Sequence, residues 1–362
     1  MSFKEATLIG TAQEAGIAQG KHFSSEIESF FEILPNLTIG KEIRLNFLPY
    51  SLVYPVLKWL TNRHFIDTLE KHVPDSIAYL HGLAEGSHRD FEDILFFSLA
   101  NVLKTRLAFF KKSFRLDYCS TVALADFSCQ PACLIGKNFD YPLDLQDFLF
   151  ITKLNVTGKH KVIGHGMIPT LALAQGVNEK GLGISLNNAH ALEESKIGVP
   201  LSIMVQEALL NCASTTEAVH FFQSTPLGNS GIITIGDIDG ELIKMEISPS
   251  QLKLKRGTRL VATNHYQSSS MKKLDAYHSQ PSSTQRYARL QQLTHQPTLS
   301  IANMKNILRD CGSNQMPGEN TICRFGAMPT IASAIIDCHA KEYWGLIGSP
   351  LTSRYQKYSF DF

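Results

Sequence analysis

The sequence predicts an α+β fold in which antiparallel sheets are covered by helices. Residues 1–113 carry mainly helical patterns, whereas short apolar strands separated by turns follow from Cys119 onward. Strands and helices come in blocks and do not alternate regularly, which favours antiparallel over parallel sheets. The chain has 362 residues and is therefore long enough to bury a core of this kind.

The N-terminal part combines helical periodicity with helix start signals. Thr11 and Glu14 have the spacing of a capping box at the head of an apolar pattern. A further helix is predicted to begin near Asp90, with Asp93 three residues later.

The rest of the chain is predicted to contain hairpins and two longer helical stretches. The helices are expected at 200–222, as one amphipathic helix, and at 283–311. Strands are expected at 119–127, 133–141, 171–188 on both sides of a turn, 231–247 across Asp239-Gly240, 251–266 and 332–348.

A cysteine and an aspartate stand at matching ends of the first two strands. A turn centred between Cys129 and Gln130 would pair Cys119 with Asp140 and place thiol and carboxylate at one sheet edge. A cysteine in a strand is usually a small buried hydrophobe, and Asp140 could simply end its strand. The register alone leaves both interpretations open.

Composition excludes several classes of function. The formal net charge is +1, so the chain has no electrostatic footprint for nucleic acid or for an anionic membrane. No apolar stretch is long enough for a membrane span, and the N-terminus lacks a secretory signal, so we expect a cytoplasmic protein. The seven cysteines do not form a disulfide framework, and the pair Cys129 and Cys133 is too weak a signal for a metal site. We expect neither a metal nor a cofactor.

Several motifs in fixed order resemble those of N-terminal-nucleophile (Ntn) hydrolases of the linear-amide group. These motifs are "YCSTVAL", "GKNFDYP", "NEKGLGISLNN", "VATNHY" and "SSTQRYARL". The group contains choloylglycine hydrolases and acyl-coenzyme A:6-aminopenicillanic acid acyltransferases, and "ILRDC" and "TICRF" make the second branch the more similar one. The resemblance implies a four-layer αββα sandwich, with a helical pro-segment over residues 1–118 and a catalytic domain over 119–362.

The resemblance also implies a nucleophile that is created inside the chain. Self-cleavage between Tyr118 and Cys119 would free the α-amine of Cys119 to act as the catalytic base. An α-amine titrates near 7.7–8.0, close to the working pH, and covalent geometry holds it beside the thiol. N-terminal threonine enzymes use the same arrangement.

Other roles follow from the resemblance. Asp140 matches the carboxylate that orients the amine, and Asn264 matches the amide that donates to the oxyanion. Asn188 matches a second oxyanion or substrate contact, although its neighbour Asn187 keeps that choice open. Arg286 matches an arginine near the nucleophile, where we expect it to form a buried pair with Asp140. Without the resemblance, the two asparagines could be turn residues and Arg286 an exposed helix residue.

Two positions depart from the family pattern. Lys137 stands where choloylglycine hydrolases have an arginine, so a bidentate substrate contact is lost. Tyr118 stands where the penicillin enzyme has glycine, so a bulky residue precedes the expected cleavage point and could slow self-cleavage.

The expected activity is cleavage or transfer of the acyl group of a linear, non-peptide amide through an acyl-thioester on Cys119. The expected partner is a small-molecule amide or acyl donor, and the two cleaved chains should stay associated; a homo-oligomer is left open. The alternatives are an N-acyltransferase that uses acyl-coenzyme A, for which no phosphate-cradling loop is visible, and an inactive Ntn-fold binding protein.

Overall fold

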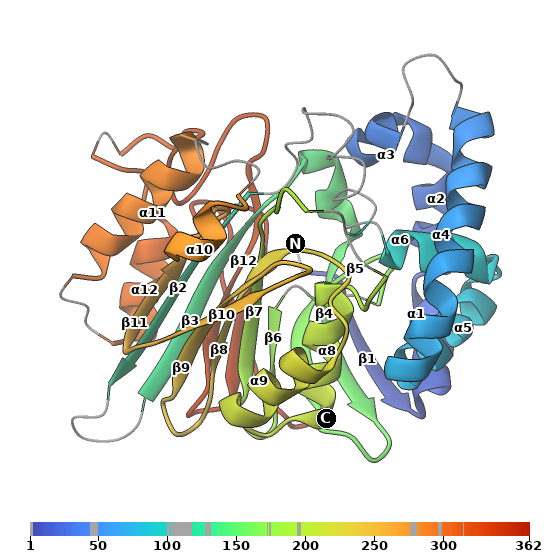
Figure 1. The fold of residues 1–362 in the computed structure, drawn as a ribbon, viewed down its shortest axis with the longest axis horizontal. Coiled ribbons are helices and arrows are strands. Elements are labelled where there is room, and N and C mark those ends of the chain that lie inside the picture. Colours follow the sequence, from blue (N-terminus) through green and yellow to red (C-terminus); the bar gives the residue numbers. More distant parts are fainter. Residues whose placement is uncertain are drawn as a thin grey trace.

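Two β-sheets lie face to face at the centre of the protein, with helices on both outer sides (Figure 1). The computed structural model describes residues 3–43, 50–99, 102, 118–126, 132–171, 173, 175–193, 197–275, 281–295, 299–313 and 315–362. The α+β class and the four-layer αββα arrangement expected from the sequence are confirmed.

The larger sheet has eight strands in the order β1-β4-β5-β6-β7-β8-β9-β10. Its strands are antiparallel except for β1, which runs parallel to β4 at one edge. Their bounds are β1 Glu5–Gly10, β4 Leu149–Val156, β5 Val162–Met167, β6 Gln175–Asn178, β7 Gly183–Asn188, β8 Gly231–Gly236, β9 Leu242–Ile247 and β10 Leu252–Arg256.

The smaller sheet has six antiparallel strands in the order β11-β2-β3-β12-β13-β14. The chain passes from one sheet to the other between β10 and β11, so that β11 lies beside β2. The bounds are β11 Arg259–Ala262, β2 Tyr118–Asp126, β3 Ala132–Asp140, β12 Thr330–Asp337, β13 Glu342–Ile347 and β14 Gln356–Tyr358.

Alternating residues of β2 and β3 serve two different cores, because successive side chains of a strand point to opposite faces. Ala123 and Ile135 fill the space between the sheets. Val122 and Leu134 pack outward, with residues of α11 (Pro281–Leu293) and α12 (Ile301–Leu308).

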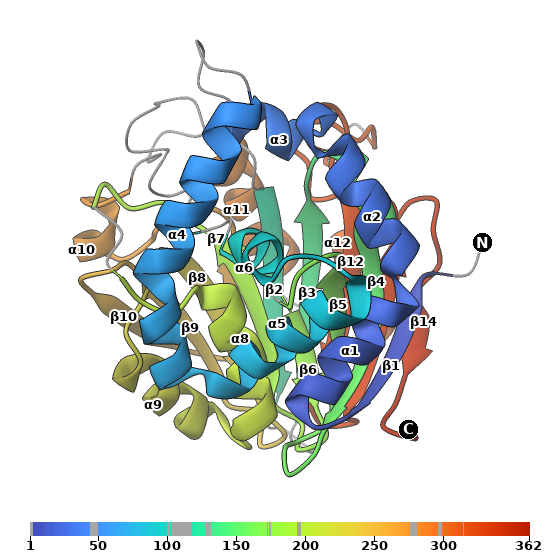
Figure 2. The ribbon, with the colours of Figure 1, turned by 90° about the vertical axis from the view of Figure 1, so that its right-hand side faces the viewer.

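The N-terminal region covers one end of the larger sheet (Figure 2) and shares its main core. Its first residues form β1 within that sheet, so the region is not only helical as its sequence suggests. The predicted capping box is present, with Thr11 and Glu14 at the head of α1. The helices given by the described residues of this region are α1 Ala12–His22, α2 Ser24–Ile33, the 3₁₀ turn η1 Leu34–Asn36, α3 Thr38–Ile43, α4 Tyr50–His72, α5 Pro74–Ser87 and α6 Phe91–Ser98.

Helices α1 and α5 touch through glycines. A Cβ on Gly16 would lie 2.0 Å from the carbonyl oxygen of Tyr79, and one on Gly82 would lie 2.0 Å from that of Gln13. Only glycine lets the two backbones approach so closely, and this contact binds the first helix of the region to its fifth.

Two predicted helices are interrupted. The stretch 200–222 forms α8 (Leu201–Asn211) and α9 (Thr215–Ser224), because Ser214 caps the second helix. Helix α8 is buried nearly all round and is therefore not amphipathic. The stretch 283–311 likewise forms α11 and α12. Two further short helices within the described ranges are η2 Leu143–Phe148 and α10 Ser269–Lys272.

The predicted register of the β2–β3 hairpin is wrong by one residue. Cys119 pairs with Phe139, and Asp140 pairs with Tyr118. The two cores decide this register, since a one-residue slip would exchange the residues between the sheets with those under α11 and α12. The predicted turn at 129–130 lies outside the described residues.

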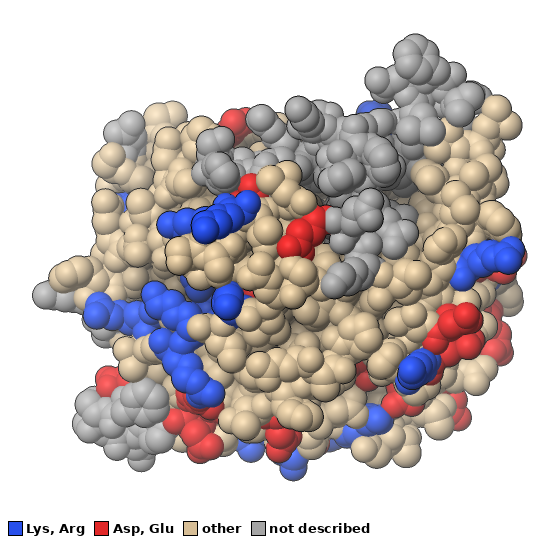
Figure 3. Space-filling view, in the orientation of Figure 1, with Lys and Arg blue, Asp and Glu red and all other residues tan. Residues whose placement is uncertain are grey.

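The surface has no single sign of charge on the face drawn in Figure 3. Basic side chains gather over the region of β10 and β11, with acidic ones beside them. No described helix combines the length and the apolar character that crossing a bilayer would require.

Candidate active site

Cys119 is buried at the start of β2, and its backbone is held by residues from two other segments. Its side chain is 1% exposed and lies on the same face of the sheet as its cross-strand partner Phe139. Its backbone nitrogen donates to Oδ1 of Asn264 at 3.0 Å. Its carbonyl oxygen accepts from Nη1 of Arg286 at 2.6 Å. The backbone of this residue is therefore fixed on both sides of its α-carbon.

Asp140 lies at the end of β3, on the opposite face of the sheet from the Cys119 side chain. It is fully buried, and its Oδ1 accepts from Oγ1 of Thr330 at 2.7 Å. Its Oδ2 accepts no hydrogen bond from the residues that the structure describes. Asp140 lies directly across from Tyr118, the residue that precedes Cys119 in the chain.

Arg286 reaches the start of β2 from the face of α11 that packs on the sheet. It is fully buried, and besides Cys119 it donates to Oγ of Ser120 at 2.9 Å and to Oδ1 of Asn264 at 2.9 Å. The direct pair with Asp140 that the sequence suggested is wrong, since every hydrogen bond of this guanidinium within the described residues goes elsewhere. The two charges interact at longer range.

Asn264 lies two residues beyond the end of β11. Ala262 pairs with Thr121, so continuing the antiparallel register places Asn264 opposite Cys119. An arginine can only donate, so the contact with Arg286 makes the atom facing Cys119 the amide oxygen. The amide nitrogen Nδ2 donates to the carbonyl oxygen of Asn188 at 2.9 Å.

Asn188 and its neighbour Asn187 have different surroundings. The side chain of Asn188 donates to the hydroxyl of Tyr141 at 3.0 Å and lines a cavity. Asn187 is fully buried and accepts from Thr121 Oγ1 at 2.6 Å between the sheets. Of the two, Asn188 is the one that lines the cavity.

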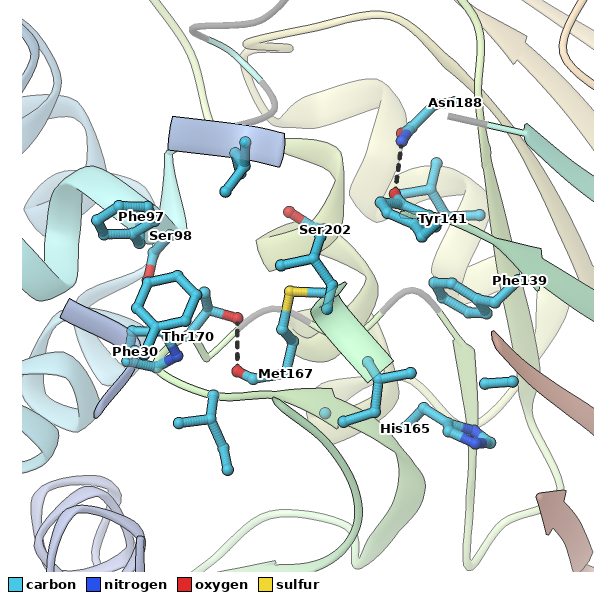
Figure 4. A pocket seen from close by; sticks show the side chains of 18 residues that line it. Phe30, Phe97, Ser98, Phe139, Tyr141, His165, Met167, Thr170, Asn188 and Ser202 are labelled. Carbon is cyan, nitrogen blue, oxygen red and sulfur yellow. Dashed lines mark hydrogen bonds between the residues drawn. The ribbon is translucent and has the colours of Figure 1, made fainter. Parts of the chain in front are cut away.

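The cavity of about 90 Å³ lies between the sheets and the N-terminal helices (Figure 4). His165 is part of its wall, and burial lowers the pKa of this side chain to about 4, so it is neutral at pH 7. The cavity therefore suits an uncharged, apolar group. The apolar side chains in its wall include Phe30, Ile39, Phe97, Phe139, Leu149 and Leu186.

Lys137, expected as a substrate contact, lies between the sheets. It is 1% exposed; its Nζ is 4.0 Å from the ring centroid of Phe139 and donates to the carbonyl oxygen of Leu186. Lys137 is not part of the cavity wall, although both of these partners are.

Arg324 is a second buried arginine that sequence reasoning did not select. It is 4% exposed, and its guanidinium carbon is 3.9 Å from the ring centroid of Tyr118. Its backbone nitrogen donates to Oγ1 of Thr330, the hydroxyl that binds Asp140. The motif "TICRF", already part of the resemblance, contains Arg324 and was the available signal.

The pKa of Asp140 reflects a balance between burial and cations. Burial raises it from the ordinary 3.8 to about 6, and the positive charges of Arg286 and Arg324 oppose that rise. Burial also lowers the pKa of Arg286 to about 10, with a further contribution from Arg324. At pH 7 the site thus combines an ionised Asp140 carboxylate with the buried side chains of Arg286 and Arg324 on the same face of the sheet.

Two facing sheets between helical layers, with buried polar groups converging on one sheet end, are the arrangement of the Ntn-type fold that the sequence resemblance implied. A family model described as "Acyl-coenzyme A:6-aminopenicillanic acid acyl-transferase" matches residues 128–352, which is more than half of the chain. The chain belongs to this family. The matched segment contains Asp140, Asn188, Asn264, Arg286 and Arg324, and it begins after Cys119.

Several solved structures resemble the chain at low identity. A Caenorhabditis elegans ortholog of N-acylethanolamine-hydrolyzing acid amidase is 16% identical, with a TM-score of 0.43, covering 61% of this chain and 93% of that one. A variant of conjugated bile acid hydrolase from Clostridium perfringens is 14% identical, with a TM-score of 0.45 and coverage of 67% and 97%. Penicillin V acylase from Agrobacterium tumefaciens is 14% identical, with a TM-score of 0.47 and coverage of 67% and 86%. No curated protein matches the sequence.

Proposed function

We propose that the protein is a self-processing cysteine enzyme that cleaves or transfers the acyl group of a linear, non-peptide amide. The observation that carries this proposal is the buried start of β2, where Asn264 and Arg286 hold the backbone of Cys119. Asp140 lies across from Tyr118, the residue before Cys119, and its Oδ2 accepts no hydrogen bond from the described residues.

Self-cleavage would be the first reaction. Sγ of Cys119 adds to the carbonyl carbon of Tyr118, the peptide C–N bond breaks, and the thiol proton passes to the departing nitrogen. Water then hydrolyses the thioester, which leaves a carboxylate on Tyr118 and a free thiol and α-amine on Cys119. The products are a pro-segment of residues 1–118 and a catalytic chain of residues 119–362. They would remain associated, because both contribute to the main core.

Turnover would reuse the same atoms. The α-amine, oriented by Oδ2 of Asp140, takes the thiol proton as Sγ adds to the substrate carbonyl, and it returns that proton to the departing amine. Water or a second amine then removes the acyl group from the thioester. Asn264 would donate its amide to the oxyanion, with Asn188 as a second contact.

The cavity indicates which half of the substrate is apolar. It lies on the face of the smaller sheet that carries Cys119 and Phe139, while Asp140, Arg286 and Arg324 lie on the other face. Lys137 is on the cavity side of the sheet but outside the cavity wall. We therefore assign an uncharged aliphatic or aromatic acyl group to the cavity and the amine half to the side of Asp140. Family membership supports acyl transfer to an amine as the alternative to hydrolysis.

The test is the mass of the purified protein together with its turnover of N-acyl amides. Wild-type protein should give copurifying fragments of 118 and 244 residues, and Cys119→Ala should stay at 362 residues and be inactive. Cys212→Ala is the matched control; burial raises the pKa of Cys212 to about 12, and its loss should change neither result. A wild-type chain that stays whole yet cleaves amides would contradict the amine mechanism, and products formed with and without added amine would separate transfer from hydrolysis.

A further inference from the structure

Tyr118 lies close to two buried guanidinium groups. Its ring centroid is 3.9 Å from the guanidinium carbon of Arg324 and 5.7 Å from that of Arg286. This residue would supply the carbonyl of the scissile bond, so whatever holds its side chain also orients the bond to be cut.

Two nitrogen atoms of the Arg324 guanidinium make no hydrogen bond with the residues that the structure describes. They are Nε and Nη1, and the residue is only 4% exposed. Burying a cation with so few partners is costly, so such a group is retained where its position has a use. The ring of Tyr118 is the group that its face contacts.

The backbone of Arg324 is tied to the same site. Its nitrogen donates to Oγ1 of Thr330 at 2.9 Å, its carbonyl oxygen accepts from the nitrogen of Thr330 at 3.2 Å, and Thr330 donates to Asp140. The backbone of Arg324 is therefore fixed relative to Asp140. The side chains of Tyr118 and Asp140 both lie on the face of the sheet opposite the thiol.

We propose that Arg324 is a positioning residue for self-cleavage, which stacks on the Tyr118 ring and thereby orients the Tyr118–Cys119 peptide for attack by Sγ. This inference rests on the proposed self-processing and adds a residue to it. The bond would then be anchored on both sides, by the side chain of Tyr118 before it and by the nitrogen and carbonyl of Cys119 after it. Fixing the reacting atoms in this way raises the rate, and a misplacement of about 1 Å can cost about 10²-fold.

The experiment measures the rate of chain cleavage from intact mass over time, starting from freshly made, full-length protein. Tyr118→Phe keeps the ring and should cleave within about threefold of the wild-type rate, whereas Tyr118→Leu should cleave about tenfold more slowly. Arg324→Lys keeps the charge but loses the planar stack, and it should also be about tenfold slower. The double variant Tyr118→Leu/Arg324→Lys should be no slower than either single variant, because both remove one contact.

A second readout separates positioning from a structural role. Once Tyr118→Leu has been cleaved completely, its catalytic chain is identical to the wild-type one, and its turnover of N-acyl amides should be within about twofold of wild type. A Tyr118→Leu or Arg324→Lys chain that cleaves at the wild-type rate, or additive losses in the double variant, would overturn the positioning role of Arg324 while leaving self-processing intact. A wild-type chain that never cleaves would instead overturn the proposed function, and the positioning role of Arg324 would fall with it.

Discussion

The two faces of the β2–β3 hairpin differ in chemistry. One carries Cys119 and Phe139, and Phe139 lines an apolar cavity whose His165 is neutral; Lys137 lies on this face outside the cavity wall. The other carries Tyr118 and Asp140 towards two buried arginines. Under the proposed function, the uncharged acyl group would lie on the first face and the carboxylate that orients the α-amine on the second.

The one-residue error in the predicted register shows why this division matters. With Cys119 opposite Asp140, thiol and carboxylate would share a face, and the carboxylate would point into the apolar space between the sheets. In the observed register the carboxylate lies across from Tyr118, on the face of the sheet opposite the Cys119 side chain. Variants on each face, and at the point where they meet, would test this separation.

Asn264 lies where the two faces meet, and its two amide atoms can be tested separately. If Asn264 donates to the oxyanion, the Asn264→Ala variant should have a kcat about 10²–10³-fold below that of the wild type. Asn264→Asp keeps an oxygen for the Cys119 nitrogen and Arg286 but has no N–H to donate, so it should be equally impaired. Single-turnover kinetics with an N-acyl amide, with melting temperature as the fold control, would measure both variants. An Asn264→Asp enzyme as active as wild type would limit this residue to holding Cys119.

Asp140 on the charged face should make stability depend on pH. Burial raises its pKa in the folded chain to about 6 from the ordinary 3.8, so the unfolded chain releases this proton first. The contribution of Asp140 to stability is therefore lost as pH rises from about 4 to about 6, by about 3 kcal/mol in total.

The measurement uses two uncleaved chains, Cys119→Ala alone and the double variant Cys119→Ala/Asp140→Asn. Between pH 4 and pH 7, the free energy of unfolding of the first chain should fall relative to that of the double variant by about 3 kcal/mol. Denaturant titrations at several pH values would measure the difference. If the free energies of unfolding of the two chains changed in parallel with pH, Asp140 would have an ordinary pKa and its carboxyl group would be more hydrated than the structure describes.

The smallest effect is expected on the apolar face. Ser202 lines the cavity, is 4% exposed, and its Oγ has no hydrogen-bond partner among the described residues. Ser202→Leu should fill part of the cavity and shift the preference in kcat/KM by about tenfold towards shorter acyl chains. Ser202→Ala is the size-matched control and should leave the preference unchanged. Cleavage of the chain should proceed normally in both, and an unchanged preference in Ser202→Leu would place the acyl group elsewhere.

Local patterns were sufficient for much of the fold. The capping box at Thr11, the hairpin across Asp239-Gly240 and the blocks of strands were predicted correctly, because turn chemistry and apolar periodicity act over a few residues. The stretch 200–222 was predicted incorrectly as one helix. Helix α8 is buried nearly all round, so no amphipathic pattern marks where it ends.

The sequence by itself determined the α+β class, the family motifs and the residue types available for chemistry at Cys119, Asp140, Asn264 and Arg286. Only the tertiary structure decided which of them touch. Packing on both sides of β2 and β3 set the register and put Asp140 across from Tyr118. Helix α11 carried Arg286 to the backbone of Cys119, and the segment before β12 carried Arg324 to Tyr118. These contacts join residues far apart in the chain, so they depend on how whole sheets and helices pack, which no local pattern specifies.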